Sequence, residues 1–168
     1  MLLVASSLHE LSFQKLMEVY AEGNRENGED RYPGESPDRR LALAEEGFRD
    51  YLSQVFFTTE NARYFILVEA GRYVSALRLE PYEDGLLLEA LETAPEFRKK
   101  GYAAALIEKT QAYLEKQGSI RLYSHVSRNN IASLRTHEKR GFRKILDYGR
   151  YIDGSIDRRT VTLLYTTE

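Results

Sequence analysis

Hydrophobic positions along the chain follow two different spacings. Apolar residues recur every three or four positions over about 9–21, 37–55, 98–117 and 130–140, which predicts four helices. Apolar or alternating runs predict a strand at the start of the chain and further strands at the following places: about 64–68, 73–79, 86–93, 120–126, 142–151 and 160–166. The predicted order is therefore β-α-α-β-β-β-α-β-α-β-β.

This order indicates an α/β fold. The unit over about 86–126 runs from strand through helix to strand, which implies a parallel pair, while the hairpins on either side imply antiparallel neighbours. We therefore expect a mixed sheet with helices on both faces. The polar stretch 22–40 predicts a loop, and Ser36-Pro37 within it provides an N-cap and a first-turn proline for the second helix.

Composition limits the class of protein. A chain of 168 residues with 42% apolar residues fits one domain, 1–168, and the absence of cysteine excludes disulfides, thiolate zinc sites and cysteine nucleophiles. The three histidines, His9, His125 and His137, are not spaced as ligands, so no metal is expected. The longest apolar run, Tyr102–Ile107, is too short to span a membrane, and the start lacks the basic flank of a signal peptide. We expect a cytoplasmic protein with no membrane partner.

Charge is unevenly distributed along the chain. The net charge of −2 argues against a nucleic-acid partner. Residues 1–84 carry 16 acids and 9 bases, whereas residues 85–168 carry 10 acids and 15 bases. The second half is therefore better suited to an anionic ligand, although solvated charge on helix faces explains the same numbers.

The start of the third predicted helix combines bases with small residues. Arg98, Lys99 and Lys100 precede Gly101, Tyr102 and Ala103. A helix N-terminus has unpaired N–H groups that attract anions, and glycine lets a phosphate approach the backbone. This turn is a candidate pyrophosphate site, but it lacks the P-loop spacing, and a basic first turn on a surface helix is the alternative.

A second cluster lies over 130–142. Asn130 begins a helix, the small Ser133 follows, and the helix ends in Glu-Lys-Arg-Gly-Phe at 138–142. Together with Arg98-x-x-Gly101-x-Ala103, this pattern resembles the GNAT superfamily of N-acetyltransferases, most strongly over 86–142. The resemblance implies the GNAT fold, a mostly antiparallel sheet of about seven strands. It also implies acetyl-CoA as co-substrate and acetyl transfer to a primary amine in a ternary complex.

The resemblance also implies a cofactor site. Backbone amides of the 98–103 turn would bind the CoA pyrophosphate, and the pantetheine arm would pair with the preceding strand at Leu91 and Thr93. The Leu91 N–H would stabilise the oxyanion, and Asn130 would contact the CoA arm. The expected cofactor-binding residues are Leu91, Thr93, Arg98, Lys99, Lys100, Gly101, Tyr102, Ala103, Asn130 and Ser133.

Three residues are candidates for proton transfer. His137 stands where the family often has a tyrosine that protonates the departing thiolate. An imidazole suits this role, although a half-exposed helix residue is the alternative. Glu89 and Glu92 are candidate bases, and strand alternation predicts that they face opposite sides of the sheet. An ion pair with a neighbour such as Arg78 is the alternative for either glutamate.

The acceptor side is expected over about 9–57, with Tyr148 and Tyr151 from the last hairpin. The 22–40 loop holds six acids and four arginines, which fits a cationic amine, either a small molecule or a peptide or protein amine. The alternative function is a non-catalytic module that binds acyl-CoA. The sequence leaves the assembly open between a monomer and a homodimer.

Overall fold

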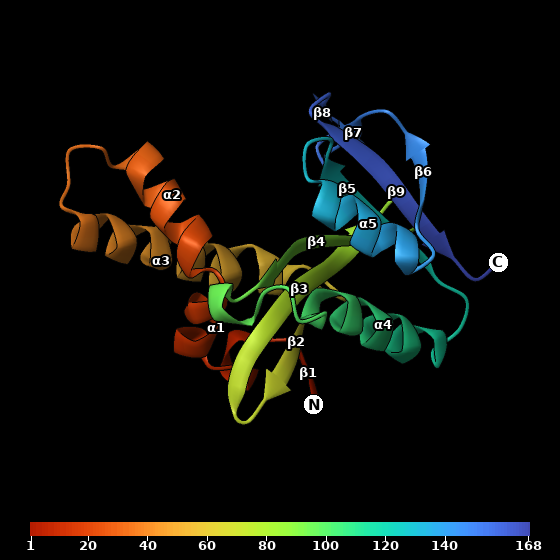
Figure 1. The fold of residues 1–168 in the computed structure, drawn as a ribbon, viewed down its shortest axis with the longest axis horizontal. Helices are drawn as coiled ribbons and strands as arrows, with labels where there is room; N and C mark the ends of the chain where they lie inside the picture. Colours follow the sequence, from red (N-terminus) through yellow and green to blue (C-terminus); the bar gives the residue numbers. More distant parts are fainter.

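The computed structural model describes residues 1–168 and contains a seven-stranded sheet (Figure 1). The strand order is β1-β2-β3-β4-β5-β9-β6, in which β4 and β5 are parallel and all other neighbours are antiparallel. The strands of this sheet are β1 (Leu2–Ala5), β2 (Arg63–Glu69), β3 (Arg72–Tyr82), β4 (Gly85–Thr93), β5 (Arg121–Ser127), β6 (Arg143–Leu146) and β9 (Thr160–Thr166). A separate two-stranded ribbon consists of β7 (Gly149–Arg150) and β8 (Ile156–Asp157).

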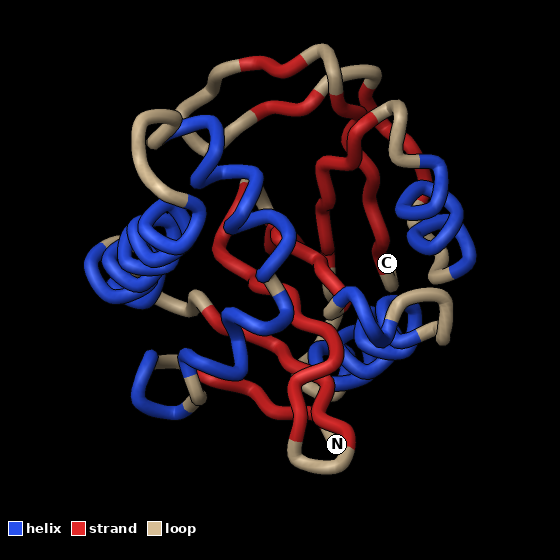
Figure 2. The backbone as a smooth tube through the Cα atoms, turned by 60° about the vertical axis from the view of Figure 1, so that its left-hand side comes forward, coloured by secondary structure: helices blue, strands red, loops and turns tan.

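Helices cover both faces of the sheet (Figure 2). One face carries α1 (Phe13–Val19), α2 (Ala21–Arg31) and α3 (Pro37–Gln54), and the other carries α4 (Tyr102–Glu115) and α5 (Ile131–Lys139). Each face has its own apolar core, the first including Leu16, Leu52 and Phe56 and the second including Leu106 and Ile107. The predicted mixed sheet with helices on both faces is confirmed.

Side-chain caps fix where three helices begin. The Ser36 hydroxyl accepts a hydrogen bond from the Arg39 N–H, with Pro37 in the first turn, as the sequence predicts. The Asn130 amide oxygen accepts from the Ser133 N–H at 3.1 Å and starts α5. Ser12 caps α1 in the same way, so this helix begins later than the predicted residue 9.

The predicted loop over 22–40 is wrong for most of its length. Residues Ala21–Arg31 form α2, although the sequence contains Gly23 and Gly28 and buries only Asn24 and Gly28. A Cβ on Gly28 would lie 2.8 Å from the Arg40 carbonyl oxygen, so α2 and α3 approach closely at this glycine. Packing against α3 therefore overrides the weak helix propensity of the segment.

Two other boundaries also differ from the prediction. The helix expected over 98–117 begins only at Tyr102, because Lys99 and Gly101 have φ values of 60° and 80° that are incompatible with a helix. The strand expected over 142–151 ends at Leu146, where its pairing with β9 shifts register and the chain leaves the sheet for the β7–β8 ribbon.

Candidate active site

The site is built around a gap between the two parallel strands. β4 and β5 pair at only three positions, the last joining Leu88 to Ser124, although β4 continues to Thr93 and β5 to Ser127. Beyond Leu88 the strands separate and leave a cavity of about 180 Å³, whose lining includes Glu89, Leu91 and His137. The gap lies between the two halves of the sheet in Figure 1.

A bulge in β4 changes which side its glutamates face. Ala90 has a φ of 51°, and the β3–β4 register shifts so that Glu89 pairs with Arg78 and Glu92 with Ala76. Because positions 76 and 78 share one face of β3, both glutamates face the α1–α3 side. The expectation that they face opposite sides is therefore wrong, since simple alternation assumes an unbulged strand.

The predicted cofactor residues gather around one cavity. It has a volume of about 570 Å³ and lies between the end of β4, the start of α4 and α5. Nine of the ten residues predicted from sequence line it: Leu91, Thr93, Arg98, Lys99, Gly101, Tyr102, Ala103, Asn130 and Ser133. The tenth, Lys100, lies outside this lining, and its ammonium group donates to the Glu96 carbonyl oxygen at 3.2 Å and lies over the Phe97 ring.

The backbone of the 98–103 turn is shaped to receive an anion. Lys99 and Gly101 both have left-handed φ values, and such local conformations direct successive N–H groups into one concavity. Gly101 also caps α4, and a Cβ at this position would meet no atom within 4 Å. The space beside Gly101 is therefore open to a ligand.

The Arg98 side chain is already engaged by carboxylates. Its guanidinium pairs with Glu92 at 3.1 Å and also with Glu22, the second residue of α2. Burial raises the pKa of Glu92, and Arg98 opposes that shift. Arg98 therefore ties the end of β4 to α2, and two carboxylates offset its charge.

His137 lies deeper than the sequence suggests. Only 1% of its surface is exposed, so the half-exposed alternative is wrong, and its ring packs edge-on against Phe142. Nδ1 lies 2.8 Å from the Ser133 carbonyl oxygen, which can only accept, so the neutral ring carries its proton there. Nε2 then accepts from the Ser124 hydroxyl at 3.0 Å. Burial lowers the pKa of His137, which favours this neutral form.

The bulge itself is held by two tyrosines. Tyr20, between α1 and α2, donates its hydroxyl to the Ala90 carbonyl oxygen at 2.7 Å, and the Tyr64 hydroxyl donates to Tyr20 at 3.1 Å. In a trans peptide the carbonyl and the following N–H point in opposite directions, so the Leu91 N–H points away from Tyr20. The orientation of this peptide is therefore fixed by a side chain from the helical layer.

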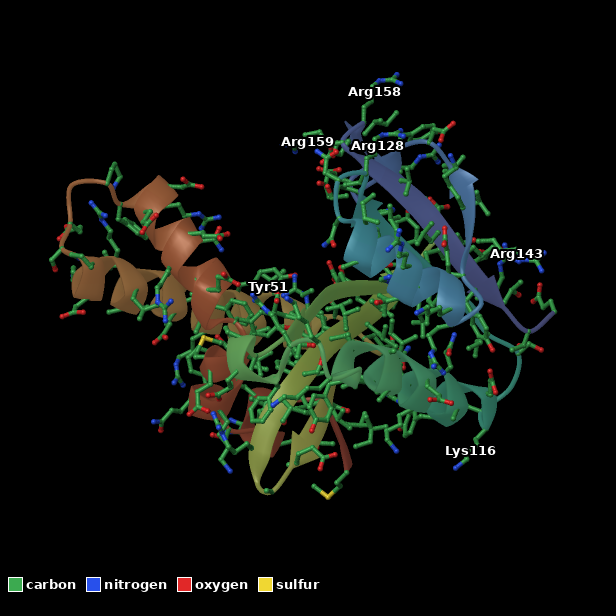
Figure 3. All side chains as sticks on the ribbon, viewed as in Figure 1. Tyr51, Lys116, Arg128, Arg143, Arg158 and Arg159 are labelled. Carbon is green, nitrogen blue, oxygen red and sulfur yellow. The ribbon has the colours of Figure 1, made fainter.

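A charged cluster lies on the same face beside the gap. The Arg78 guanidinium lies 3.5 Å from the Glu89 carboxylate, with the two side chains 15% and 25% exposed. The Arg78 guanidinium also stacks on the ring of Tyr51. Figure 3 shows Tyr51 at the place where α3 meets the sheet. Glu80, 8% exposed, completes the cluster. Sequence reasoning missed Glu80. The signal was the alternation of Arg78 and Glu80 with Leu77 and Leu79, which places the two charged residues on one face of β3.

A groove between α2 and α3 adjoins this cluster. It has a volume of about 310 Å³, and its lining includes Asn24, Arg31, Phe48, Tyr51 and Arg78. Both charged groups in the lining are arginines. The six acids of the 22–40 segment are exposed and none lines the groove: Glu22, Glu26, Glu29, Asp30, Glu35 and Asp38. The acidity read from sequence therefore belongs to the outer surface.

The remaining sequence candidates lie at the far side of the gap. His125 on β5 is half-buried, with its ring edge-on to Tyr82 and Tyr151, and burial lowers its pKa. Tyr151 is 47% exposed and its hydroxyl donates to the Asp157 carboxylate at 3.1 Å.

No cluster of three or more potential metal-ligating side chains is present. No helix has the length and apolar character needed to cross a bilayer.

Comparison with known families identifies the class of protein. Residues 18–142 match the model of the acetyltransferase (GNAT) family, which covers most of the chain. The protein therefore belongs to the GNAT acetyltransferase family, as its motifs indicate. The family and its CoA-bound structural neighbours support binding of CoA or acetyl-CoA.

Solved structures share the fold at low sequence identity. The PaiA N-acetyltransferase of Thermoplasma acidophilum, in complex with coenzyme A, is 16% identical with a TM-score of 0.64, covering 99% of each chain. The ribosomal-protein-S18-alanine N-acetyltransferase of Escherichia coli is 20% identical with a TM-score of 0.60, covering 99% of this chain and 94% of its own. An aminoglycoside 6'-acetyltransferase type Ii is 15% identical with a TM-score of 0.61, and the match covers 97% of this chain and 96% of that enzyme's chain. No curated protein matches the sequence.

Proposed function

We propose that residues 1–168 form one N-acetyltransferase domain that transfers an acetyl group from acetyl-CoA to a primary amine by direct attack. The observation that carries the proposal is the single cavity lined by nine of the predicted cofactor residues. This cavity shares Leu91, Asn130 and Ser133 with the strand gap, so a thioester can pass from one into the other. The charged cluster beside Glu89 then lies next to the reacting carbon.

The main-chain donor of the reaction is the Leu91 N–H. When an amine attacks the thioester, negative charge develops on the carbonyl oxygen, and a fixed N–H donor stabilises it without reorganisation. Tyr20 keeps this peptide in one orientation through the Ala90 carbonyl. We therefore assign Tyr20 as a positioning residue for the oxyanion donor.

Proton transfer falls to Glu89 and His137 in this proposal. Glu89 lines the strand gap, whereas Glu92 is held by Arg98 at the cofactor cavity, so Glu89 is the better placed base. His137 lines the same gap as Glu89. To protonate the thiolate it must first gain a proton at Nε2, against the effect of burial.

The acceptor's body is proposed to lie in the groove between α2 and α3. Arg31 and Arg78 lie in the groove lining, and Arg31 is seven positions after Asn24 in α2, about 10 Å further along the helix axis. Because Arg78 already pairs with Glu89, Arg31 is the group in the lining that would repel a second ammonium on the acceptor and bind a carboxylate or another oxygen-rich group. The groove thus favours an amine that carries such a group over a polyamine.

An assay of CoA-thiol release with a panel of amines tests the proposal. The panel contains a polyamine, an aminoglycoside, acidic amino acids and short peptides with free N-termini. Release with at least one amine, and product of the mass of the acetylated amine, supports an enzyme. Calorimetric binding of acetyl-CoA without release for any amine would instead indicate the non-catalytic acyl-CoA-binding module.

A further inference from the structure

Glu80 occupies an unusual place for a carboxylate with no assigned role. It lies on β3, two residues after Arg78 and therefore on the same face. Arg78 pairs with Glu89 and Glu80 pairs with Leu87, so Glu80 and Glu89 are diagonal neighbours across two strands. Long side chains at such positions can reach one another. Glu80 is only 8% exposed, and one carboxylate oxygen of Glu89, Oε1, is buried without a hydrogen-bond partner.

The surroundings supply one positive charge for these two carboxyls. Arg78 is that charge, at 3.5 Å from Glu89. The other titratable groups facing the cluster are three tyrosines and His125 of β5. The tyrosines are Tyr51 of α3, Tyr64 of β2 and Tyr20 at the α1–α2 junction. Burial raises the pKa values of the tyrosines and lowers that of His125, so all of these groups are uncharged at neutral pH.

Two carboxylates beside one guanidinium repel each other when both are ionised. Burial, together with the neighbouring Glu89, raises the pKa of Glu80 to about 7. In such coupled groups the proton belongs to the pair rather than to one residue. A carboxyl that gains and loses a proton near neutral pH is a stronger base than an isolated glutamate with a pKa of about 4.3.

We propose that Glu80 and Glu89 act as a proton-sharing pair, in which Glu89 takes the proton of the acceptor ammonium and Glu80 sets its basicity. This inference rests on the proposed acetyl transfer. One N–H bond of the ammonium breaks, an O–H bond forms on Glu89, and the electron pair stays on nitrogen to attack the thioester. The pair later releases the proton to water through the gap, so acetyl-CoA and an ammonium yield amide, CoA thiol and one proton. Glu80 is thus a positioning residue that acts through Glu89.

The pH profile of kcat tests this role. With saturating acetyl-CoA and an amine that the panel shows to be acetylated, we expect an acid limb with a midpoint near 7. Glu80→Gln keeps the size and hydrogen bonding of the side chain but removes its charge. In this variant the midpoint of the acid limb should shift to lower pH by at least about one unit, and kcat at pH 8 should fall about 3–30-fold.

A matched control separates this effect from a structural one. Glu69→Gln makes the same chemical change at an exposed position at the end of β2 and should leave both quantities unchanged. If Glu80 only supports the fold, Glu80→Gln lowers kcat by the same factor at every pH and leaves the acid limb in place. That result would overturn the proposal.

A second measurement needs neither substrate nor a variant. Carbon-13 NMR of the glutamate carboxyls in the native protein should show one of the pair titrating between about pH 6 and 8. Ordinary titration of both carboxyls below about pH 5.5 rejects the pair even in an active enzyme. Absence of thiol release with every amine rejects the proposed function instead, so the two failures are distinguishable.

Discussion

Replacing Gly101 by valine places a branched side chain where the proposed pyrophosphate meets the start of α4. Gly101 has a φ of 80°, and a Cβ there would meet no protein atom within 4 Å, so the new methyl groups extend into the cofactor cavity. They would displace a phosphate oxygen and remove a charge-assisted hydrogen bond. The loss amounts to about 1–3 kcal/mol of binding free energy. At 1.4 kcal/mol for each tenfold change, Kd for acetyl-CoA should rise about 5- to 150-fold.

The same substitution also strains the backbone, and Gly71 provides a control for that strain. Gly71 has a φ of 75°, is equally free of contacts at a Cβ position, and lies in the β2–β3 turn. Gly71→Val and Gly101→Val should lower Tm by similar amounts, since a branched residue in a left-handed conformation is unfavourable at either position. The Kd of Gly71→Val for acetyl-CoA should match that of wild type.

Circular dichroism first shows whether each variant is folded. Isothermal titration calorimetry then compares the Kd for acetyl-CoA of the two variants with that of wild type. Weaker binding by Gly101→Val alone supports a cradle at this turn. If folded Gly101→Val binds acetyl-CoA as tightly as Gly71→Val and wild type, the phosphates bind elsewhere and the reasoning from the left-handed turn is refuted.

Three further predictions concern proton transfer and positioning. If His137 protonates the thiolate, His137→Phe should lower kcat by about 10²–10⁴-fold in steady-state kinetics, without a change in cofactor affinity. His137→Tyr should recover part of the lost kcat. Normal turnover by His137→Phe would exclude the acid role. Tyr20→Phe frees the Ala90 carbonyl and should lower kcat about tenfold with little change in Kd for acetyl-CoA, whereas an equal loss in both would indicate general damage to the cavity. The pKa of Glu80 is higher in the folded protein than in the unfolded chain. The stabilisation that its protonated carboxyl contributes is therefore lost as pH rises from about 4 to 7. Glu80→Gln should therefore have a higher Tm relative to wild type at pH 8 than at pH 5, and an equal difference at both values would contradict the raised pKa.

Local patterns in the sequence were sufficient to predict where two helices begin and which residues line one cavity. The Ser36-Pro37 cap and the Asn130 cap are short-range signals, and the structure uses both. The spacing of Arg98, Gly101 and Ala103 likewise predicted three residues that line one cavity. These features depend on contacts within a few residues, which a single sequence displays directly.

Features that depend on distant contacts could not be predicted in this way. The α2 helix depends on the close approach of Gly28 to Arg40, and the segment's own composition favours a loop. The bulge at Ala90 is held by Tyr20, 70 positions away, and it alone decides which side Glu92 faces. Neither contact leaves a periodic pattern in the sequence.

The composition of α2 has a consequence for how this protein can change over evolutionary time. No residue of α2 belongs to either apolar core, and its two buried residues are Asn24 and Gly28. Substitutions on the rest of this helix therefore cost the fold little, typically within about 0.5 kcal/mol. Because α2 forms one wall of the proposed acceptor groove, mutations there would alter acceptor preference while the proposed cofactor cavity, built on β4, α4 and α5, stays as it is. On the proposed assignment of the two sites, selection would act on what is acetylated almost independently of how the acetyl group is delivered.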